Sequence, residues 1–223
     1  MKKFKILDNT TIKLIAIIIM LMDHITIAFF PEKIIFIKIG EIAFPLFAFC
    51  IAEGFHYTKD KKKYFLNLFG FAIISEVCFD LGLYGKIYWF HQNVLFTMSI
   101  AVLLLIIYEK IMKSKKFTND IKVALICTSL SISLMISLVM FTDHTMYGIL
   151  LIFIYYILRD KPLIKFPLAA LLLFIVFPYK FALISIPILL LYNGKRGFNL
   201  KYFFYSFYPV HLLIIAIVRL FIK

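Results

Sequence analysis

The stretch KLIAIIIMLMDHITIAFF, Lys13 to Phe30, decides the fold. Its apolar residues are numerous enough to carry a helix across the hydrocarbon core of a membrane, which takes about 20 residues. Asp23 and His24 nevertheless stand side by side within it. An aspartate at the centre of a membrane helix costs roughly 2.5–3.5 kcal/mol on insertion scales. Ionisable residues kept at that cost indicate a functional site inside the membrane.

The composition of the whole chain agrees with a membrane protein. Of its 223 residues 63% are hydrophobic, and the mean hydropathy is +0.97. Soluble domains are nearer half apolar, so we predict an all-α, polytopic membrane helix bundle in contact with lipid. The net charge of +13 does not indicate a nucleic-acid partner, because the lysines form short runs between apolar segments. Cys50, Cys78 and Cys127 have the spacing of neither a disulfide framework nor a metal site.

Nine apolar segments are candidates for membrane-crossing helices. They cover residues 12–30, 34–55, 64–83, 93–111, 121–141, 145–158, 163–177, 179–192 and 202–221. Basic residues concentrate in every second loop, the pattern that cytoplasmic loops follow. We therefore expect nine crossings, with the N-terminus inside and the C-terminus outside. Residues 163–192 are also compatible with one broken hairpin around FPYK, Phe177 to Lys180.

Polar residues of the predicted helices converge on one depth, most of them in the outer half of the membrane and His211 near the middle of the last helix. They are Asp23, His24, Glu41, Glu76, Asp80, Asn93, Thr97, Asp143, His144 and His211. Glu76 and Asp80 share a helix face, and two close carboxylates in low dielectric do not both stay ionised without a cation or hydrogen bonds. The acids have two interpretations, a catalytic site or hydrogen bonds that hold helices together. For the two histidines we favour the functional one.

A second polar group lies toward the inner surface. It consists of Lys13, Glu53, His56, Lys59, Lys61, Lys62, Lys63, Lys195 and Arg196. Lys13 precedes His24 by eleven residues, which places both on nearly the same helix face about 16 Å apart along the axis. This geometry fits a long anionic ligand that enters from inside with its reactive end near His24. Lysines here are also typical of snorkelling anchors and topology determinants.

Five stretches of the chain together resemble the TraX family, which is named for the enzyme that acetylates the N-terminus of conjugative pilin. They are KLIAIIIMLMDHI (Lys13–Ile25), GEIAFPLFAFCIAEGFHYTKDKKKY (Gly40–Tyr64), ISEVCFDLG (Ile74–Gly82), NVLFTM (Asn93–Met98) and KYFFYSFYPVHLLII (Lys201–Ile215). The spacing of Lys13 and His24 and the FYPVHL motif are also similar to transmembrane acyltransferases that modify surface glycans. In those proteins a basic residue and a catalytic histidine share the first helix. The basic residue is usually Arg there, whereas Lys binds phosphate without a bidentate fork.

The resemblance implies that residues 1–223 form one transmembrane acyltransferase-like domain. It implies transfer of an acetyl group from cytoplasmic acetyl-CoA, bound by the inner basic residues with Glu53 and His56 at the entrance. The acceptor would be a peptide amine or a glycan hydroxyl or amine on the outer side. Because a thioester is already activated, we expect no metal. Abundant Lys, Ile and Phe are typical of an AT-rich genome, so we expect the cell membrane of a bacterium.

Within that reaction His24 is implied as the general base or as a transient acetyl carrier. His211 would bind the thioester oxygen or act as a second acid/base group. We expect a carboxylate of another helix, Glu41, Glu76 or Asp80, to orient His24. Asp23 is a poorer candidate for that role, since adjacent helical residues point about 100° apart.

Two other classes of protein share some of these features. Acids and histidines at membrane depth also mark proton- or cation-coupled transporters and channels. The paired broken helices of inverted repeats, common in transporters, are not evident in the sequence. A non-catalytic membrane assembly protein is the third class. Micromolar-range binding of acetyl-CoA would distinguish the enzyme from both. No motif specifies the acceptor or the oligomeric state.

Overall fold

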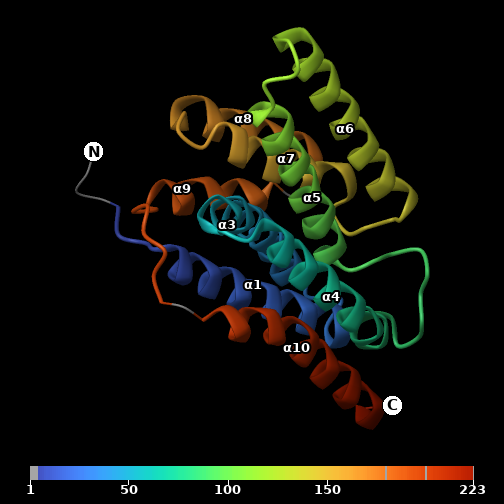
Figure 1. Ribbon diagram of the computed structural model, residues 1–223. Helices are drawn as coiled ribbons and strands as arrows, with labels where there is room; N and C mark the ends of the chain where they lie inside the picture. The colour runs from blue at the N-terminus through green and yellow to red at the C-terminus, as the bar shows by residue number, and fades with distance from the viewer. Residues whose placement is uncertain (1–4, 179, 199, 223) are drawn as a thin grey trace.

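Polar capping residues mark where several long helices begin in the computed structural model, which describes residues 5–178, 180–198 and 200–222 (Figure 1). The capped helices are α1 (Asn9–Phe29), α4 (Lys61–Phe79), α5 (Val94–Lys113) and α6 (Asn119–Val139). Their caps are Asp8, Asp60, Asn93 and Thr118, whose side-chain oxygens accept from backbone N–H groups of the first turn. These bonds satisfy donors that have no partner inside a helix.

The second apolar segment is broken into two helices. α2 (Ile34–Gly40) and α3 (Ala43–Tyr57) are separated by Glu41 and Ile42. The Glu41 carboxylate accepts from the backbone N–H of Phe181 at 3.0 Å. It thereby caps the 3-10 turn η3 (Phe181–Ile184), which continues into α9 (Ser185–Leu190). Through Glu41, the break between α2 and α3 is therefore hydrogen-bonded to a distant part of the chain.

The remaining elements complete an all-helical fold. They are the π-helical turn η2 (Asp80–Tyr84), α7 (Thr145–Ile157), α8 (Pro162–Val176) and α10 (Lys201–Ile222). The predicted all-α fold is confirmed for the described residues, which form no β-strand.

Six segments of the described chain are long and apolar enough to cross a membrane. They are Asn9–Phe29, Ile34–Tyr57, Lys61–Tyr84, Val94–Lys113, Asn119–Val139 and Tyr202–Ile222. The other predicted crossings correspond to the shorter apolar helices Thr145–Ile157, Pro162–Val176 and Phe181–Leu190. These lengths and compositions are those of a multi-pass membrane protein.

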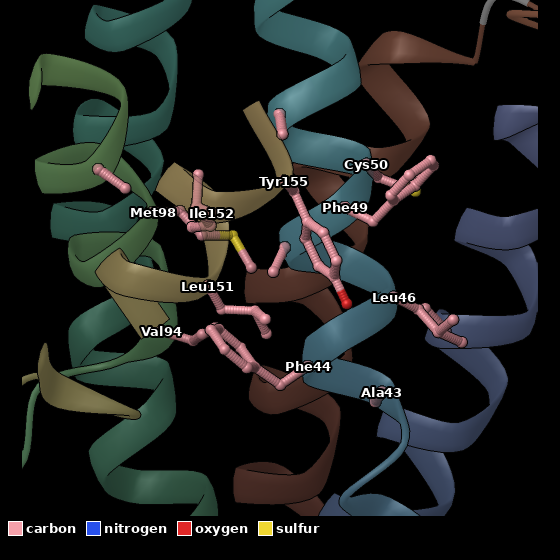
Figure 2. Close-up of a cluster of buried hydrophobic side chains, with 14 of the residues drawn as sticks. Ala43, Phe44, Leu46, Phe49, Cys50, Val94, Met98, Leu151, Ile152 and Tyr155 are labelled. Atoms are coloured by element: carbon pink, nitrogen blue, oxygen red, sulfur yellow. The ribbon is translucent and has the colours of Figure 1, made fainter. Parts of the chain in front are cut away.

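The core forms where α3 meets α5 and α7 (Figure 2). The rings of Phe49 on α3 and Tyr155 on α7 pack edge to face with their centroids 5.6 Å apart. Leu46 and Ile152 beside them are completely buried. α6 lies outside this core against α5 and α7, and most of its surface is exposed (Figure 1).

The two ends of the bundle differ in charge. At one end, here called the basic end, α1, α4 and α10 begin and α3 finishes, and Lys59 and Arg196 lie in its loops. At the other, the distal end, loop 85–93 meets loop 140–144, because the Asp143 N–H donates to the Gln92 carbonyl at 2.8 Å. α1 and α10 run side by side between the two ends (Figure 1).

Candidate functional site

His24 of α1 and His211 of α10 form a hydrogen-bonded pair. Nδ1 of His24 lies 2.8 Å from Nε2 of His211, and the rings stack with centroids 5.0 Å apart. Nδ1 of His211 lies 2.8 Å from the Phe207 carbonyl oxygen. Because a carbonyl only accepts, His211 carries its proton on Nδ1, and its Nε2 accepts from His24 Nδ1–H. Neutral His24 therefore has its lone pair on Nε2, the form that a general base or a nucleophile needs.

A cavity of about 450 Å³ leads from the basic end toward this pair. Its lining includes Asn9, Lys13, Ile17 and Met20 of α1 and Phe204, Tyr205, Phe207 and Tyr208 of α10. His24 follows Met20 by four residues, about 6 Å along the helix axis, and His211 follows Tyr208 by three, about 4.5 Å. The cavity thus ends one helical turn from the two histidines. Its volume is within the roughly 300–1,000 Å³ of typical small-molecule sites.

Basic side chains surround the mouth of the cavity. Lys13, Lys59, Lys63 and Arg196 line it, together with the carboxylate of Asp60. The Lys13 ammonium lies over the Phe204 ring, 5.1 Å from its centroid, and it forms no ion pair with the acids that the structure describes. Arg196 is close enough to repel it electrostatically. Four basic side chains gathered around one carboxylate at the mouth of a cavity indicate a site for an anion.

The loop that carries Arg196 is fastened to the start of α1. The Thr10 hydroxyl donates to the carbonyls of Arg196 and Phe198, at 3.1 and 2.8 Å. Gly194 and Gly197 flank this basic segment with φ of +81° and +74°, a conformation that favours glycine. A Cβ on Gly197 would lie 2.6 Å from the Asp8 carboxyl carbon. The two glycines therefore permit the turns that bring Arg196 to the mouth.

Five of the predicted cofactor-binding residues do not line the cavity. They are Glu53, His56, Lys61, Lys62 and Lys195. The Glu53 carboxylate is buried and accepts from Arg159 Nε at 2.9 Å and from the Tyr192 hydroxyl at 3.1 Å, so it fastens α3 to distant loops. Lys61 turns to the Phe55 carbonyl and to Glu109. His56, Lys62 and Lys195 are exposed. Helical periodicity explains the difference on α3, since Ile51 and Gly54 face the cavity and Glu53 faces another neighbour.

The prediction that a carboxylate orients His24 is wrong, because His211 occupies that place. Glu76 accepts from the backbone N–H of Asn93 at 3.0 Å, and Asp80 from that of Tyr88 at 2.9 Å. Glu41 caps η3 as described above. Carboxylates in low dielectric need donors, and the free N–H groups at helix starts and in nearby turns supply them.

Asp23 packs against α2, away from the pair's hydrogen bond. A Cβ on Gly40 would overlap the Asp23 carboxylate, so the missing side chain at Gly40 makes room for this contact. No hydrogen bond joins Asp23 to His24 in the described structure. The helix geometry that made Asp23 a poor orienter therefore agrees with its position.

A second polar cluster joins the two distal loops. The Asp143 carboxylate lies 3.5 Å from His91 Nε2 and 3.6 Å from His144 Nε2. The Tyr84 hydroxyl shares a hydrogen bond with His91 Nδ1. Burial raises the pKa of Asp143, but the neighbouring His144 and His91 outweigh it and bring the pKa to about 2. The hydrogen bond to Asp143 raises the pKa of His91.

The sequence analysis singled out Asp143 and His144, but it contained no signal that His91, 52 positions before Asp143, contacts them. The pairing of His24 with His211 was missed for the same reason, since 187 positions separate the two histidines. No three His, Cys, Asp or Glu side chains among the described residues are placed to hold a metal ion.

Comparisons with known proteins give the family. The TraX protein family matches residues 8–219. The probable fimbrial assembly protein FimC, serogroup H1, of Dichelobacter nodosus is 28% identical over 246 residues, which cover 95% of this chain and 96% of that protein. No solved structure matches the chain. The resemblance seen in the sequence is thus confirmed, and the chain belongs to the TraX family.

Proposed function

We propose that this protein is an integral membrane acetyltransferase that uses acetyl-CoA. The observation that carries the proposal is the cavity that runs from a cationic mouth to within about one helical turn of the His24–His211 pair. Coenzyme A has phosphates at one end and a long arm that ends in a thioester. Lys13, Lys59 and Arg196 suit the phosphates, and the apolar walls beyond them suit the arm.

The proposal includes an orientation. The basic end faces the cytoplasm of a bacterial cell, where acetyl-CoA is made and where basic loops are retained. The chain then makes nine crossings, with its N-terminus inside and its C-terminus outside. The three shorter helices cross where the bundle thins the bilayer around them.

His24 is the general base of this reaction. Its Nε2 takes a proton from the acceptor as the acceptor attacks the thioester carbonyl carbon, and it returns the proton to the leaving sulfur. His211 is a positioning residue, since its Nε2 accepts from His24 Nδ1–H and so keeps the lone pair of His24 on Nε2. Lys13 and Arg196 hold the phosphates and thereby fix how far the thioester reaches.

The acceptor is proposed to belong to a surface structure. The relative from Dichelobacter nodosus is named for fimbrial assembly, which favours the amine of a secreted filament protein. A glycan hydroxyl or amine at the cell surface is the alternative acceptor. Feeding labelled acetate to cells with and without the gene identifies the acceptor, which is the surface component that loses label when the gene is absent.

The test is turnover of labelled acetyl-CoA by the purified protein in detergent. His24→Asn keeps a side-chain N–H near the place of Nδ1, facing His211, but removes Nε2. We expect its turnover to fall by about 10²–10⁴-fold, the usual contribution of a general base. His56→Asn is the matched control, because the His56 ring is exposed and lies outside the cavity. Wild-type turnover in His24→Asn would remove His24 from the chemistry.

Binding separates the enzyme from the two other classes of protein. A transporter or a non-catalytic assembly protein has no need for acetyl-CoA, whereas the enzyme requires affinity in the micromolar range. Titration calorimetry with CoA and with its dephosphorylated arm measures this directly. Absence of binding would contradict the acetyltransferase and favour the other classes.

A further inference from the structure

Tyr208 occupies the position between the cavity and the histidine pair. Its side chain is 5% exposed and lines the cavity. Its ring packs edge-on against both imidazoles, with centroids 6.2 Å from His24 and 5.5 Å from His211. Among the described residues, Tyr208 alone both lines the cavity and makes ring contacts with both histidines. Tyr208 is therefore next to any acyl group that reaches from the cavity toward His24.

His211 is not free to bind the thioester oxygen. Its Nδ1–H donates to the Phe207 carbonyl, and its Nε2 accepts from His24. Attack on a thioester nevertheless places negative charge on the carbonyl oxygen, and a hydrogen-bond donor aimed at that oxygen is usually the largest single contribution to catalysis. A different donor, at the end of the cavity near the two histidines, has to supply this hydrogen bond.

The Tyr208 hydroxyl has the environment of such a donor. The Tyr208 oxygen lies near the backbone N–H of Val94, the first residue of α5. A phenolic oxygen that faces an N–H still has its own proton to donate. Val94 and Leu95 line the cavity as well, so this hydroxyl and the start of α5 lie at the same wall.

We propose that Tyr208 is a further catalytic residue, whose O–H donates to the thioester carbonyl oxygen; this rests on the proposed acetyltransferase function. The acceptor atom bonds to the carbonyl carbon while His24 Nε2 takes its proton, and the carbonyl π electrons move to the oxygen. Tyr208 stabilises that oxyanion and keeps its own proton. The electrons then return, the C–S bond breaks, and the sulfur takes the proton from His24.

The test replaces the hydroxyl and leaves the ring. Tyr208→Phe keeps the edge-on packing against both histidines, and wild type and variant are compared in turnover of labelled acetyl-CoA and in binding of CoA. We expect kcat to fall by about 10²–10³-fold, the usual effect of losing one oxyanion donor. The Kd for CoA should change by less than about threefold, since CoA lacks the acyl oxygen and the contacts at the mouth are intact.

Tyr108→Phe is the matched control, because Tyr108 lies on α5 outside the cavity and packs against Phe153 and Tyr156. The proposal is overturned if Tyr208→Phe keeps kcat within about threefold of wild type, or if the loss appears in CoA binding with kcat unchanged. A wild-type protein without acetyl-CoA turnover would overturn the acetyltransferase function itself. Activity in wild type but equal activity in Tyr208→Phe would overturn this inference alone.

Discussion

A backbone carbonyl, rather than an acid, sets the direction of the hydrogen bond between His24 and His211. The Phe207 carbonyl requires a proton on His211 Nδ1, and every later assignment of protons in the pair follows from that bond. A neutral imidazole is cheaper to keep at membrane depth than a carboxylate, because burial disfavours the charged form of a group. The pair therefore orients a base without a permanent charge.

Two substitutions of His211 test the hydrogen bond that it accepts from His24. In His211→Gln the side-chain carbonyl lies near the place of Nε2 and can still accept from His24 Nδ1–H, whereas His211→Leu leaves that donor unpaired. An unpaired buried donor costs about 1–3 kcal/mol, so we expect turnover in His211→Leu to fall roughly 5- to 150-fold. His211→Gln should retain most of the activity. Equal losses in the two variants would contradict a positioning role for His211.

Among the elements, the π-helical turn η2 lets α10 approach α4 closely. Gly82 stands in this turn, and a Cβ there would lie 2.9 Å from the backbone oxygen of Leu212, the residue after His211. Backbone cannot yield as a flexible side chain does, so α10 would have to move.

We expect Gly82→Ala to destabilise the protein by about 1–3 kcal/mol, as overpacking of a tight contact does. Gly70→Ala is the control on the preceding helix, since a Cβ there meets nothing within 4 Å. It should gain up to about 1 kcal/mol from helix propensity. Thermal unfolding in detergent measures both changes. Equal and small effects would show that α10 accommodates the added methyl group without moving.

The distal loops are joined by a pH-sensitive contact. The ordinary pKa of His91 is 6.5, and the bond to Asp143 raises it, so this contact is fully stabilising below pH 6.5 and weakens as the pH rises through the higher value. The pKa of Asp143 is lowered from 3.8 to about 2. The contribution of its carboxylate to stability is therefore complete above pH 3.8 and is lost as the pH falls through about 2.

We therefore expect the unfolding temperature of wild type to exceed that of His91→Gln most between pH 3.8 and 6.5. Glutamine keeps a neutral N–H near Asp143 but does not titrate in this range. The difference should shrink at higher pH. A difference that stays constant up to pH 9 would show that the charge of His91 contributes nothing.

Hydropathy predicted the long apolar segments, but neither the break between α2 and α3 nor how the helices meet. The run from Lys13 to Phe30 defines the length of α1 and the depth of His24, since both depend only on local sequence. The partner of His24 depends on how α1 and α10 are rotated about their axes, and 187 positions separate the two histidines. The same limit explains why the hydrogen-bond partners of the carboxylates were not predicted. Glu41 and Glu76 were predicted as polar residues of the helices, but which N–H groups they reach depends on packing that no periodicity records.

At the scale of the whole molecule, charge and the cavity are aligned. The chain has a net charge of +13, and the basic side chains that line the cavity stand at one end of it. The apolar walls beyond them have a low dielectric and focus the field along the cavity. An anion is therefore attracted to the mouth, and a neutral arm can continue inward at little electrostatic cost.

Lys59 and Lys62, three positions apart, test whether the mouth itself binds the anion. Lys59 lines the cavity and Lys62 does not, so Lys59→Gln and Lys62→Gln make the same change in net charge at different places. If the phosphates sit at the mouth, Lys59→Gln should weaken CoA binding several-fold more than Lys62→Gln at low salt. The difference should narrow at high salt, because the Debye length falls from about 10 Å at 0.1 M to about 3 Å at 1 M. Equal effects at every salt concentration would mean that only the overall charge attracts CoA, and the mouth would lose its role as the phosphate site. Calorimetric titration across this range decides between a local site and a diffuse field.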